Sequence, residues 1–327
     1  MNRENSLVSV CVVTYNSSEF IIETLESIKK QTYPNIELVI SDDCSSDNTI
    51  DICKQWINEY GDLFVNVSLI TAPINTGTAG NANRGLAACH GEWIKYIGGD
   101  DILLSDAIEN YYNYVKEHDN VFALFSDCIE FRNRLADSNF RLQRVALRHF
   151  AFRKAITAQS QHSILSKTYF GLGSTFFCAK KVLVDVGGFD ERFPLIDDYP
   201  LFIKITKYGY KLYLIPIVTV YKRVHVESVS HARTADSIYS KAIVLCVNEY
   251  RLLYKRESLG FFWRIMLNYS IFLYCNVISS GNTNKSLKCK IYYCIQRLFD
   301  PFNWYSKIIN RLDWVYSIFE VYKWKNM

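Results

Sequence analysis

The chain has 327 residues with a formal net charge of +4, and 49% of them are apolar, enough for one large domain or two small ones with a full core. This mild charge gives no nucleic-acid-binding signature, and the ten cysteines, none spaced as Cys-x-x-Cys, do not support a zinc site. The polar start has no signal-peptide pattern, so we expect reduced core thiols in a cytosolic protein.

The first hundred residues alternate short apolar runs with segments that repeat apolar residues at helical spacing. The runs predict buried strands, which cover residues 8–14, 36–40, 65–70 and 93–97. Helices are expected between them, the second capped by Ser46 and the third running from Gly77 to about Cys89. This alternation predicts an α/β fold, a mostly parallel sheet with helices on both faces.

The alternation continues more weakly after the fourth run. The expected helices and strands cover residues 105–117, 121–125, 171–179, 196–208 and 212–221. Between 131 and 166 the pattern favours a loop and one or two helices over the cleft.

The last third, after about residue 237, is expected to be helical, aromatic and basic. We therefore divide the chain into a catalytic domain, residues 1–236, and a C-terminal region, residues 237–327. The most apolar stretch contains Arg264 and Asn268, which are costly in lipid, so peripheral membrane contact is the most we expect. The Tyr and Trp residues at 304–323 fit either membrane contact or an ordinary core.

Ligands of parallel α/β sheets bind at the carboxyl ends of the strands. Polar residues follow three predicted strands there: Thr14, Tyr15, Asn16, Asp42, Asp43, Asp100 and Asp101. Two adjacent carboxylates after two glycines suit Mg²⁺ or Mn²⁺, which can neutralise a diphosphate leaving group. Asp100 and Asp101 also fit the start of a helix, where acids are favoured.

Four features of the sequence carry further candidate chemistry. Asp42 or Asp43 can accept from a base N–H or a ribose hydroxyl, or can simply precede a helix cap. The glycine-spaced segment Asn75–Gly85 allows close approach, and its Arg84 can face a phosphate, although such spacing alone is weak.

The pair Asp197-Asp198 offers a carboxylate that can take a proton from an acceptor hydroxyl, or it is a capped helix start. His225 can bind a metal or a diphosphate, or be a hydrogen-bonded structural histidine.

Taken in this order, the motifs resemble those of the family 2 glycosyltransferases with the GT-A fold, over about residues 7–231. The matching segments are Val8–Asn16, Asp42–Thr49, Asn75–Gly85, Gly99–Asp101, Gly187–Asp190, Asp197-Asp198 and Arg223–Ser230. The chain departs from the family pattern at Gly98, where Asp is frequent, at Ala82, where Arg is frequent, and at Asp197, where Glu is usual.

The resemblance implies an inverting hexosyltransferase that moves Gal or Glc from a UDP-sugar in one in-line displacement. It implies that Thr14 and Tyr15 border the uracil and that Asp198 is the base. The implied nucleotide-binding residues are Thr14, Tyr15, Asn16, Asp42, Asp43, Asn75, Arg84, Gly99 and Asp100. The implied ligands of a divalent metal, Mn²⁺ or Mg²⁺, are Asp100, Asp101 and His225.

The motif set also resembles bacterial transferases that build O-antigen, lipopolysaccharide or capsule repeats. It implies a GlcNAc- or GalNAc-diphosphate-polyprenol acceptor and a peripheral position at the cytoplasmic face of the inner membrane.

Two other functions stay open. A sugar-phosphate nucleotidyltransferase should carry a basic, Gly-rich loop after the first strand, where Thr14–Ser18 has neither feature. The second is a non-catalytic nucleotide-sugar-binding protein, and the acidic residues at positions 100, 101 and 198 argue against it.

Overall fold

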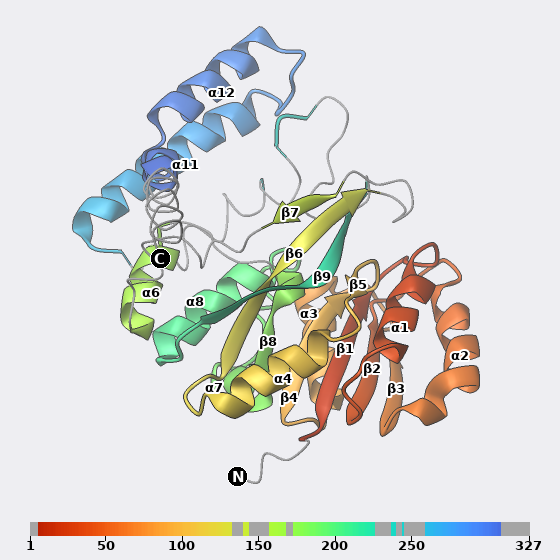
Figure 1. Ribbon diagram of the computed structural model, residues 1–327. Helices are drawn as coiled ribbons and strands as arrows, with labels where there is room; N and C mark the ends of the chain where they lie inside the picture. The colour runs from red at the N-terminus through yellow and green to blue at the C-terminus, as the bar shows by residue number, and fades with distance from the viewer. Residues whose placement is uncertain are drawn as a thin grey trace. The chain divides into compact units, whose positions relative to one another are not determined.

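Two compact units make up the chain, shown in the computed structural model of Figure 1. The structure describes residues 6–132, 140–143, 157–167, 173–225, 237–239, 244 and 259–308. The first unit contains residues 1–145 and 171–225, and the second contains 146–170 and 226–327. Residues 146–170 thus group with the C-terminal part, whereas we expected one boundary after residue 236. The assignment of catalysis and acceptor contact to two domains stays a prediction.

The core of the first unit is a sheet whose parallel half comes from the apolar runs. Its strands are β1 (Val8–Thr14), β2 (Ile36–Asp42), β3 (Asn66–Thr71) and β4 (Trp93–Gly98), and their order is β3-β2-β1-β4. Every residue of β2 is buried, as expected for a strand covered on both faces. Val8 pairs with Ile36 and with Trp93, so the carboxyl ends of β1, β2 and β4 lie at one edge.

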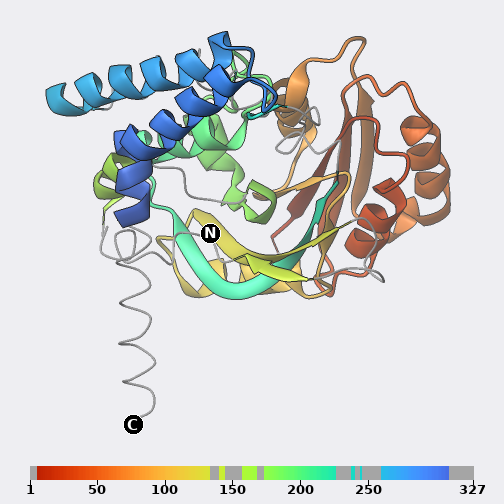
Figure 2. The same cartoon turned by 90° about the horizontal axis from the view of Figure 1, so that it is seen from above.

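The other half of the sheet is mixed. It adds β8 (Phe177–Ala179), β6 (Ala123–Arg132), β9 (Tyr213–Val224) and β5 (Ile102–Leu103) in that order after β4, with β7 (Arg141–Gln143) beside β6. β8 is antiparallel to β4, whereas β6 and β9 are parallel to each other. Figure 2 shows β6 and β9 as long curved strands lying side by side, with register shifts between Phe125 and Cys128. The predicted α/β, mostly parallel sheet is confirmed.

Helices cover both faces of this sheet. Right-handed crossovers place α1 (Ile21–Lys29) and α2 (Thr49–Tyr60) on one face and α3 (Gly77–Ala88), which returns the chain to β4, on the other. The remaining described elements of the unit are α4 (Ala107–Glu117), η1 (Gly61–Leu63), η4 (Gly173–Thr175), α7 (Lys180–Asp185) and α8 (Asp198–Tyr208).

The predicted cap at Ser46 is wrong. The helix α2 begins at Thr49, whose N–H donates to Asp47 Oδ1 at 3.0 Å. The N–H of Ser46 instead donates to Asn16 Oδ1 at 2.8 Å, because this residue lies in a loop that is held against the end of β1. The short elements β5, β7 and α7 were not predicted, since two to six residues carry too little periodicity.

The second unit is helical where it is described. Its helices are α6 (Ala158–Leu165), α11 (Phe261–Ser279) and α12 (Leu287–Phe299), which confirms a helical C-terminal region. Tyr274 and Val277 of α11 pack against Cys289 of α12. By length and composition alone, α11 is the one described helix that is able to cross a membrane, and 28% of its apolar window is buried. The predicted aromatic residues beyond 308 lie outside the described residues.

Candidate active site

The ends of β1 and β4 approach each other closely at Gly99. Its N–H donates to Val13 O at 3.0 Å, and a Cβ on Gly99 would lie 2.6 Å from Thr14 Oγ1. Glycine is therefore required for this approach. The carbonyl of Thr14 accepts the N–H of Asp43 at 3.0 Å, which ties β1 to the end of β2. The structure thus brings the predicted residues Thr14, Asp43 and Gly99 to one place.

The loops after β1 and β2 are joined through Ser45. The buried Asp42 accepts the N–H of Ser45 on Oδ1 at 2.8 Å and its hydroxyl on Oδ2 at 2.5 Å. The same hydroxyl accepts the N–H of Asn16 at 2.8 Å. Tyr15, next to Asn16, is 49% exposed. A carboxylate fixed by hydrogen bonds and an accessible aromatic ring therefore lie in adjoining loops. Such an arrangement can hold a planar nucleobase.

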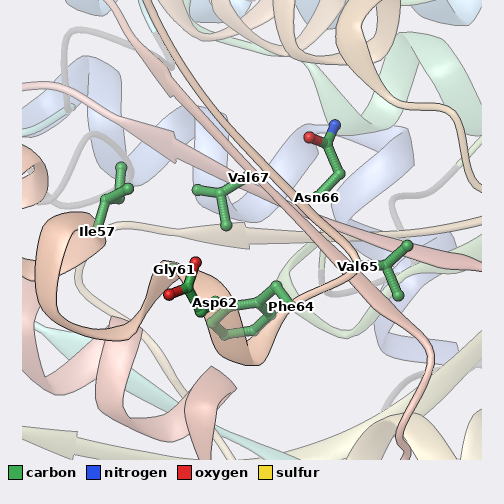
Figure 3. Close-up of a pocket in the computed structure, with 7 residues that line it drawn as sticks. All are labelled: Ile57, Gly61, Asp62, Phe64, Val65, Asn66 and Val67. Carbon is green, nitrogen blue, oxygen red and sulfur yellow. The ribbon is translucent and has the colours of Figure 1, made fainter.

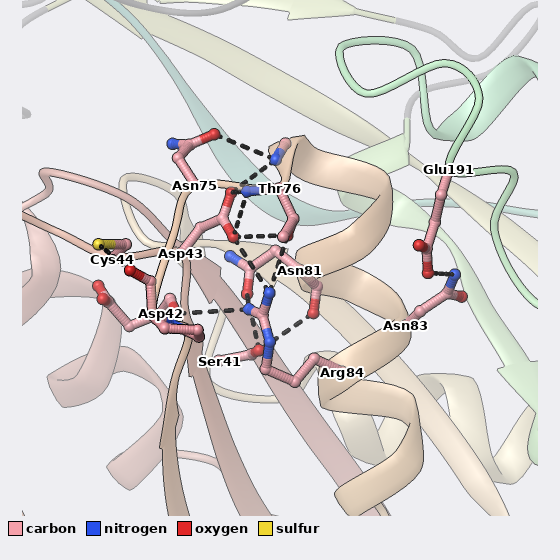
Figure 4. Close-up of polar contacts among 12 residues, drawn as sticks. Ser41, Asp42, Asp43, Cys44, Asn75, Thr76, Asn81, Asn83, Arg84 and Glu191 are labelled. Atoms are coloured by element: carbon pink, nitrogen blue, oxygen red, sulfur yellow. Dashed lines mark hydrogen bonds and ion pairs between the residues drawn. The ribbon is translucent and has the colours of Figure 1, made fainter.

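Asp43 fixes the start of α3 (Figure 4). Its buried carboxylate accepts the N–H of Thr76 at 2.9 Å, the Thr76 hydroxyl at 2.7 Å and the N–H of Gly77 at 2.7 Å. An anion is favoured there because the first N–H groups of a helix have no partner inside it. Asn75 Oδ1 accepts the same Gly77 N–H at 3.1 Å.

Arg84 completes this network from within α3. Its Nη1 donates to Asn81 Oδ1 at 2.9 Å, and its Nη2 donates to Thr76 Oγ1 at 2.8 Å and to Asp43 Oδ1 at 3.2 Å. Only 21% of its side chain is exposed. The guanidinium is thus held by protein oxygens and stiffens one side of the site.

Asp100 and His225 form the one predicted metal pair that the structure brings together. Asp100 Oδ2 lies 3.0 Å from His225 Nε2, and their side chains are 28% and 16% exposed. The ring of Phe20 packs on His225 with centroids 4.9 Å apart. A carboxylate oxygen and an imidazole nitrogen thus lie against each other, and both side chains remain partly accessible. Ser228 and Ser230 of the predicted motif lie outside the described residues.

Asp101 is held by the backbone of β9. Its Oδ1 accepts the N–H of Arg223 on β9 at 2.8 Å, and burial together with the charge of Asp100 raises its pKa to about 7. Arg223 is itself buried and donates to Asp100 O at 2.8 Å and to Glu23 Oε2 at 3.0 Å. Among the described residues no three acids, histidines or cysteines converge on one metal position. Asp100 and His225 are the two predicted ligands that the structure pairs, and the full set of Asp100, Asp101 and His225 stays a prediction.

The predicted base stands at the start of α8. Asp198 Oδ1 accepts the N–H of Tyr199 at 2.7 Å. The neighbouring Asp197 has its pKa raised to about 7 by burial and by the charge of Asp198. Near neutral pH the pair thus combines a readily protonated carboxyl group with a second carboxyl group beside it, as acid–base sites do.

Asn83 of α3 holds the loop that leads to α8, a role that the sequence did not suggest. Its Oδ1 accepts the N–H of Phe189 at 2.8 Å, and its Nδ2 donates to Phe189 O at 3.0 Å and to Glu191 Oε1 at 2.7 Å, the contact drawn in Figure 4. No role was predicted for Arg223, which opens the predicted segment Arg223–Ser230, and Lys95 was missed. The signal for Lys95 was available, since it is a charged residue inside an apolar buried strand.

A pocket at the other end of the sheet does not belong to this site. Figure 3 shows its lining residues, which come from the end of α2 and the start of β3: Ile57, Gly61, Asp62, Phe64, Val65, Asn66 and Val67. The acids lie at the carboxyl ends of the parallel strands, whereas this hollow lies at the amino end of β3.

Comparison with known proteins gives the family. The model of "Glycosyl transferase family 2" matches residues 9–183, more than half of the chain. "UDP-Glc:alpha-D-GlcNAc-diphosphoundecaprenol beta-1,3-glucosyltransferase WfaP" of Escherichia coli is 30% identical over 226 residues, 68% of this chain and 80% of that protein. "Glycosyltransferase GlyG" of Streptococcus pneumoniae is 35% identical over 115 residues, 35% of this chain but only 37% of its own length.

A solved structure gives the fold. S. aureus TarS residues 1–349, in complex with UDP-GlcNAc, superposes with a TM-score of 0.59 at 20% identity, over 94% of this chain and 83% of that one. The predicted GT-A fold is therefore confirmed. The chain belongs to glycosyl transferase family 2 and is a glycosyltransferase built on the GT-A fold.

Proposed function

We propose that the chain is an inverting hexosyltransferase that moves Gal or Glc from a UDP-sugar to a GlcNAc- or GalNAc-diphosphate-polyprenol. The product would be a repeat unit of an O-antigen, lipopolysaccharide or capsule. The observation that carries this proposal is the pairing of Asp100 with His225 at the glycine-rich end of β4. The name of WfaP, which states a UDP-Glc donor and a diphosphoundecaprenol-linked acceptor, supports the choice of substrates.

The nucleotide is proposed to bind along the ends of β1 and β2. Tyr15 stacks on the uracil, and Asp42 accepts from it, with Thr14 and Asn16 beside it. Asp43, Asn75 and Arg84 keep the start of α3 in place, and Gly99 lets the ribose-diphosphate pass close to the backbone. The full proposed set is Thr14, Tyr15, Asn16, Asp42, Asp43, Asn75, Arg84, Gly99 and Asp100.

Asp100 and His225 are proposed to hold Mn²⁺ or Mg²⁺. A carboxylate oxygen and an imidazole nitrogen that lie against each other and are both partly accessible suit such a cation, and imidazole favours Mn²⁺ over Mg²⁺. When bound, the ion neutralises the charge that develops on the departing diphosphate. Asp101 supports the pair by holding β9, which carries Arg223 and leads into His225.

The transfer step needs a group that accepts the proton of the acceptor hydroxyl. Asp198 is proposed to take this proton while the acceptor oxygen bonds to the anomeric carbon and the bond from that carbon to the UDP oxygen breaks. One displacement from the face opposite UDP inverts the anomeric centre. Asn83 helps to orient this base by holding the loop that precedes α8.

The acid pair predicts a pH dependence. Because the pKa of Asp197 is raised to about 7, the pair takes up a proton as pH falls through that value, and we expect kcat to fall with it. Asp197→Asn removes the group that takes up this proton, so the acid limb moves to lower pH. The measurement is kcat against pH for both proteins. An acid limb that does not move contradicts the coupling.

Peripheral contact with the cytoplasmic face of the inner membrane is part of the proposal. Apolar side chains are exposed along one stripe of α11, with Phe261 82%, Ile265 47% and Phe272 60% exposed. We expect the double variant Phe261→Ser/Phe272→Ser to sediment less with anionic lipid vesicles than the wild type. Phe140→Ser, at an exposed phenylalanine of the first unit, is the matched control. Equal sedimentation of all three proteins would remove α11 from the membrane contact.

The direct test of the function is UDP release by the purified protein with Mn²⁺, UDP-sugars and a synthetic GlcNAc- or GalNAc-diphosphate-lipid. Acceptor-dependent release with one donor establishes the transfer and names the sugar. Tight UDP binding without release from any pair would favour a non-catalytic nucleotide-sugar-binding protein. Formation of a UDP-sugar from UTP and a sugar phosphate would identify a nucleotidyltransferase.

A further inference from the structure

The η4 turn is held in place by side chains buried in the core. Three successive carbonyls of this segment accept hydrogen bonds from such side chains. Those of Ser174 and Phe176 accept from Lys95 Nζ, the latter at 3.5 Å, and that of Thr175 accepts from the Tyr111 hydroxyl at 2.6 Å. The position of this turn is therefore set by polar contacts rather than by apolar packing alone.

Lys95 is an unusual residue for its place. It lies in the centre of β4, is 0% exposed, and has an apolar residue on either side in the sequence. Burial lowers its pKa to about 7, against the opposing effect of the negative charge of Asp101. A buried amine is costly unless its protons are hydrogen-bonded, and Lys95 also donates to Tyr96 O at 2.9 Å. Lys95 thus donates its hydrogen bonds to backbone carbonyls of the η4 segment and of its own strand.

Tyr111 of α4 adds a second buried anchor. Its ring stacks on Phe177, with centroids 5.0 Å apart, and its hydroxyl also lies 2.8 Å from Ser126 Oγ and from Thr219 Oγ1. The turn consequently rests on a polar cluster that joins β4, α4, β6 and β9.

On its other side the turn touches the proposed base. A Cβ built on Gly173 would lie 3.2 Å from both Cβ and Oδ2 of Asp198. The backbone of Gly173 therefore lies directly against this carboxylate. A shift of the turn would change the space in which the carboxylate can rotate.

We propose that Lys95 is a positioning residue for the transfer step: its ammonium fixes η4, and Gly173 of η4 in turn fixes the carboxylate of Asp198. This inference rests on the proposed function, in which Asp198 is the base. It assigns a role to the one lysine inside β4, which no part of the nucleotide or metal site uses.

The first test is Lys95→Met, which keeps the length of the side chain and removes its donors. We expect kcat for transfer to fall about 10- to 100-fold, because a displacement of about 1 Å at the reacting groups costs that much. The KM for the donor and the Kd for UDP stay unchanged, since Lys95 contacts neither site. Equal losses in kcat and in UDP binding would overturn the proposal.

The matched control is Lys180→Met. Lys180 also donates to a backbone carbonyl, Cys89 O at 2.6 Å, but at the amino end of β4, away from the acids. Its kcat should stay close to that of the wild type. If Lys95→Met does not fold, Tyr111→Phe tests the same turn by removing the bond to Thr175 O, together with the contacts of the hydroxyl with Ser126 and Thr219, and a smaller fall in kcat is expected.

A double-mutant cycle separates positioning from general stability. Adding Lys95→Met to Asp198→Asn should cost no further activity, because the residue acts through the base that is already lost. If the activity losses of the two single variants multiply in the double variant, the proposal is overturned.

A crystal structure of Lys95→Met gives an outcome that does not depend on turnover, so it is distinct from failure of the proposed function. Displacement of residues 173–175 and of the Asp198 carboxylate supports the inference, and an unchanged turn refutes it.

Discussion

Asp198→Asn is expected to lower kcat for transfer about 10²- to 10⁴-fold, the usual contribution of a general base. The carboxamide keeps the shape of the side chain and can still accept the N–H of Tyr199, so α8 should begin at the same residue. It cannot take a proton from the acceptor hydroxyl. The measurement is the initial rate of acceptor-dependent UDP release, with Kd for UDP measured on the same preparation.

The binding measurement decides the assignment of Asp198. UDP affinity should match the wild type, because the nucleotide is proposed to bind along β1 and β2. Asp51→Asn is the matched control, since its side chain is 83% exposed on α2 and should leave the rate unchanged. Loss of UDP affinity in parallel with the rate would show that Asp198 serves the donor and would remove it as the base.

Loss of the metal pair is expected to have the second large effect. His225→Gln and Asp100→Asn should each abolish the enhancement of UDP binding by Mn²⁺. They should lower kcat about 10²-fold or more, because Lewis-acid stabilisation of a leaving group is worth several kcal/mol. Titration of UDP with and without Mn²⁺ measures the first effect, and the rate of transfer measures the second.

The control for this pair is His90→Gln. His90 also lies against a buried acid, with Nδ1 2.7 Å from Glu37 Oε1, but it follows α3 at the amino end of β4. The metal dependence of this variant should equal that of the wild type. If His225→Gln keeps the full Mn²⁺ effect, the cation is held elsewhere and the proposed pair is refuted.

The regular part of the fold was predictable from residue pattern alone. β1, β2 and β4 are short apolar runs, and their burial in a parallel sheet follows from that composition. The end of an apolar run does not always give the end of the strand. The strand β6, for example, continues to Arg132, seven residues past its predicted end. Pairing with β9 extends it, and such pairing between distant strands leaves little trace in local sequence.

The acids of the site were predictable, but their partners were not. Asp42, Asp43 and Asp100 follow buried strands, so their common edge could be derived. The hydrogen-bond partners of each side chain depend on residues that are distant in sequence. Arg84 was expected to face a phosphate, and the structure engages its guanidinium with Asn81, Thr76 and Asp43. Asp101 lies in the expected place but accepts from Arg223, more than a hundred residues away.

The helix α3 serves two sides of the site at once. Arg84 and Asn81 hold the strand ends on the donor side, while Asn83 holds the loop that leads to α8. One helix of twelve residues therefore contacts both the strand ends of the proposed donor site and the loop that leads to the proposed base. Insertion of one residue between Asn81 and Asn83 would turn Asn81 by about 100° relative to Asn83 and Arg84. Under the proposed function, the order of these residues along α3 therefore matters for the alignment of donor and acceptor.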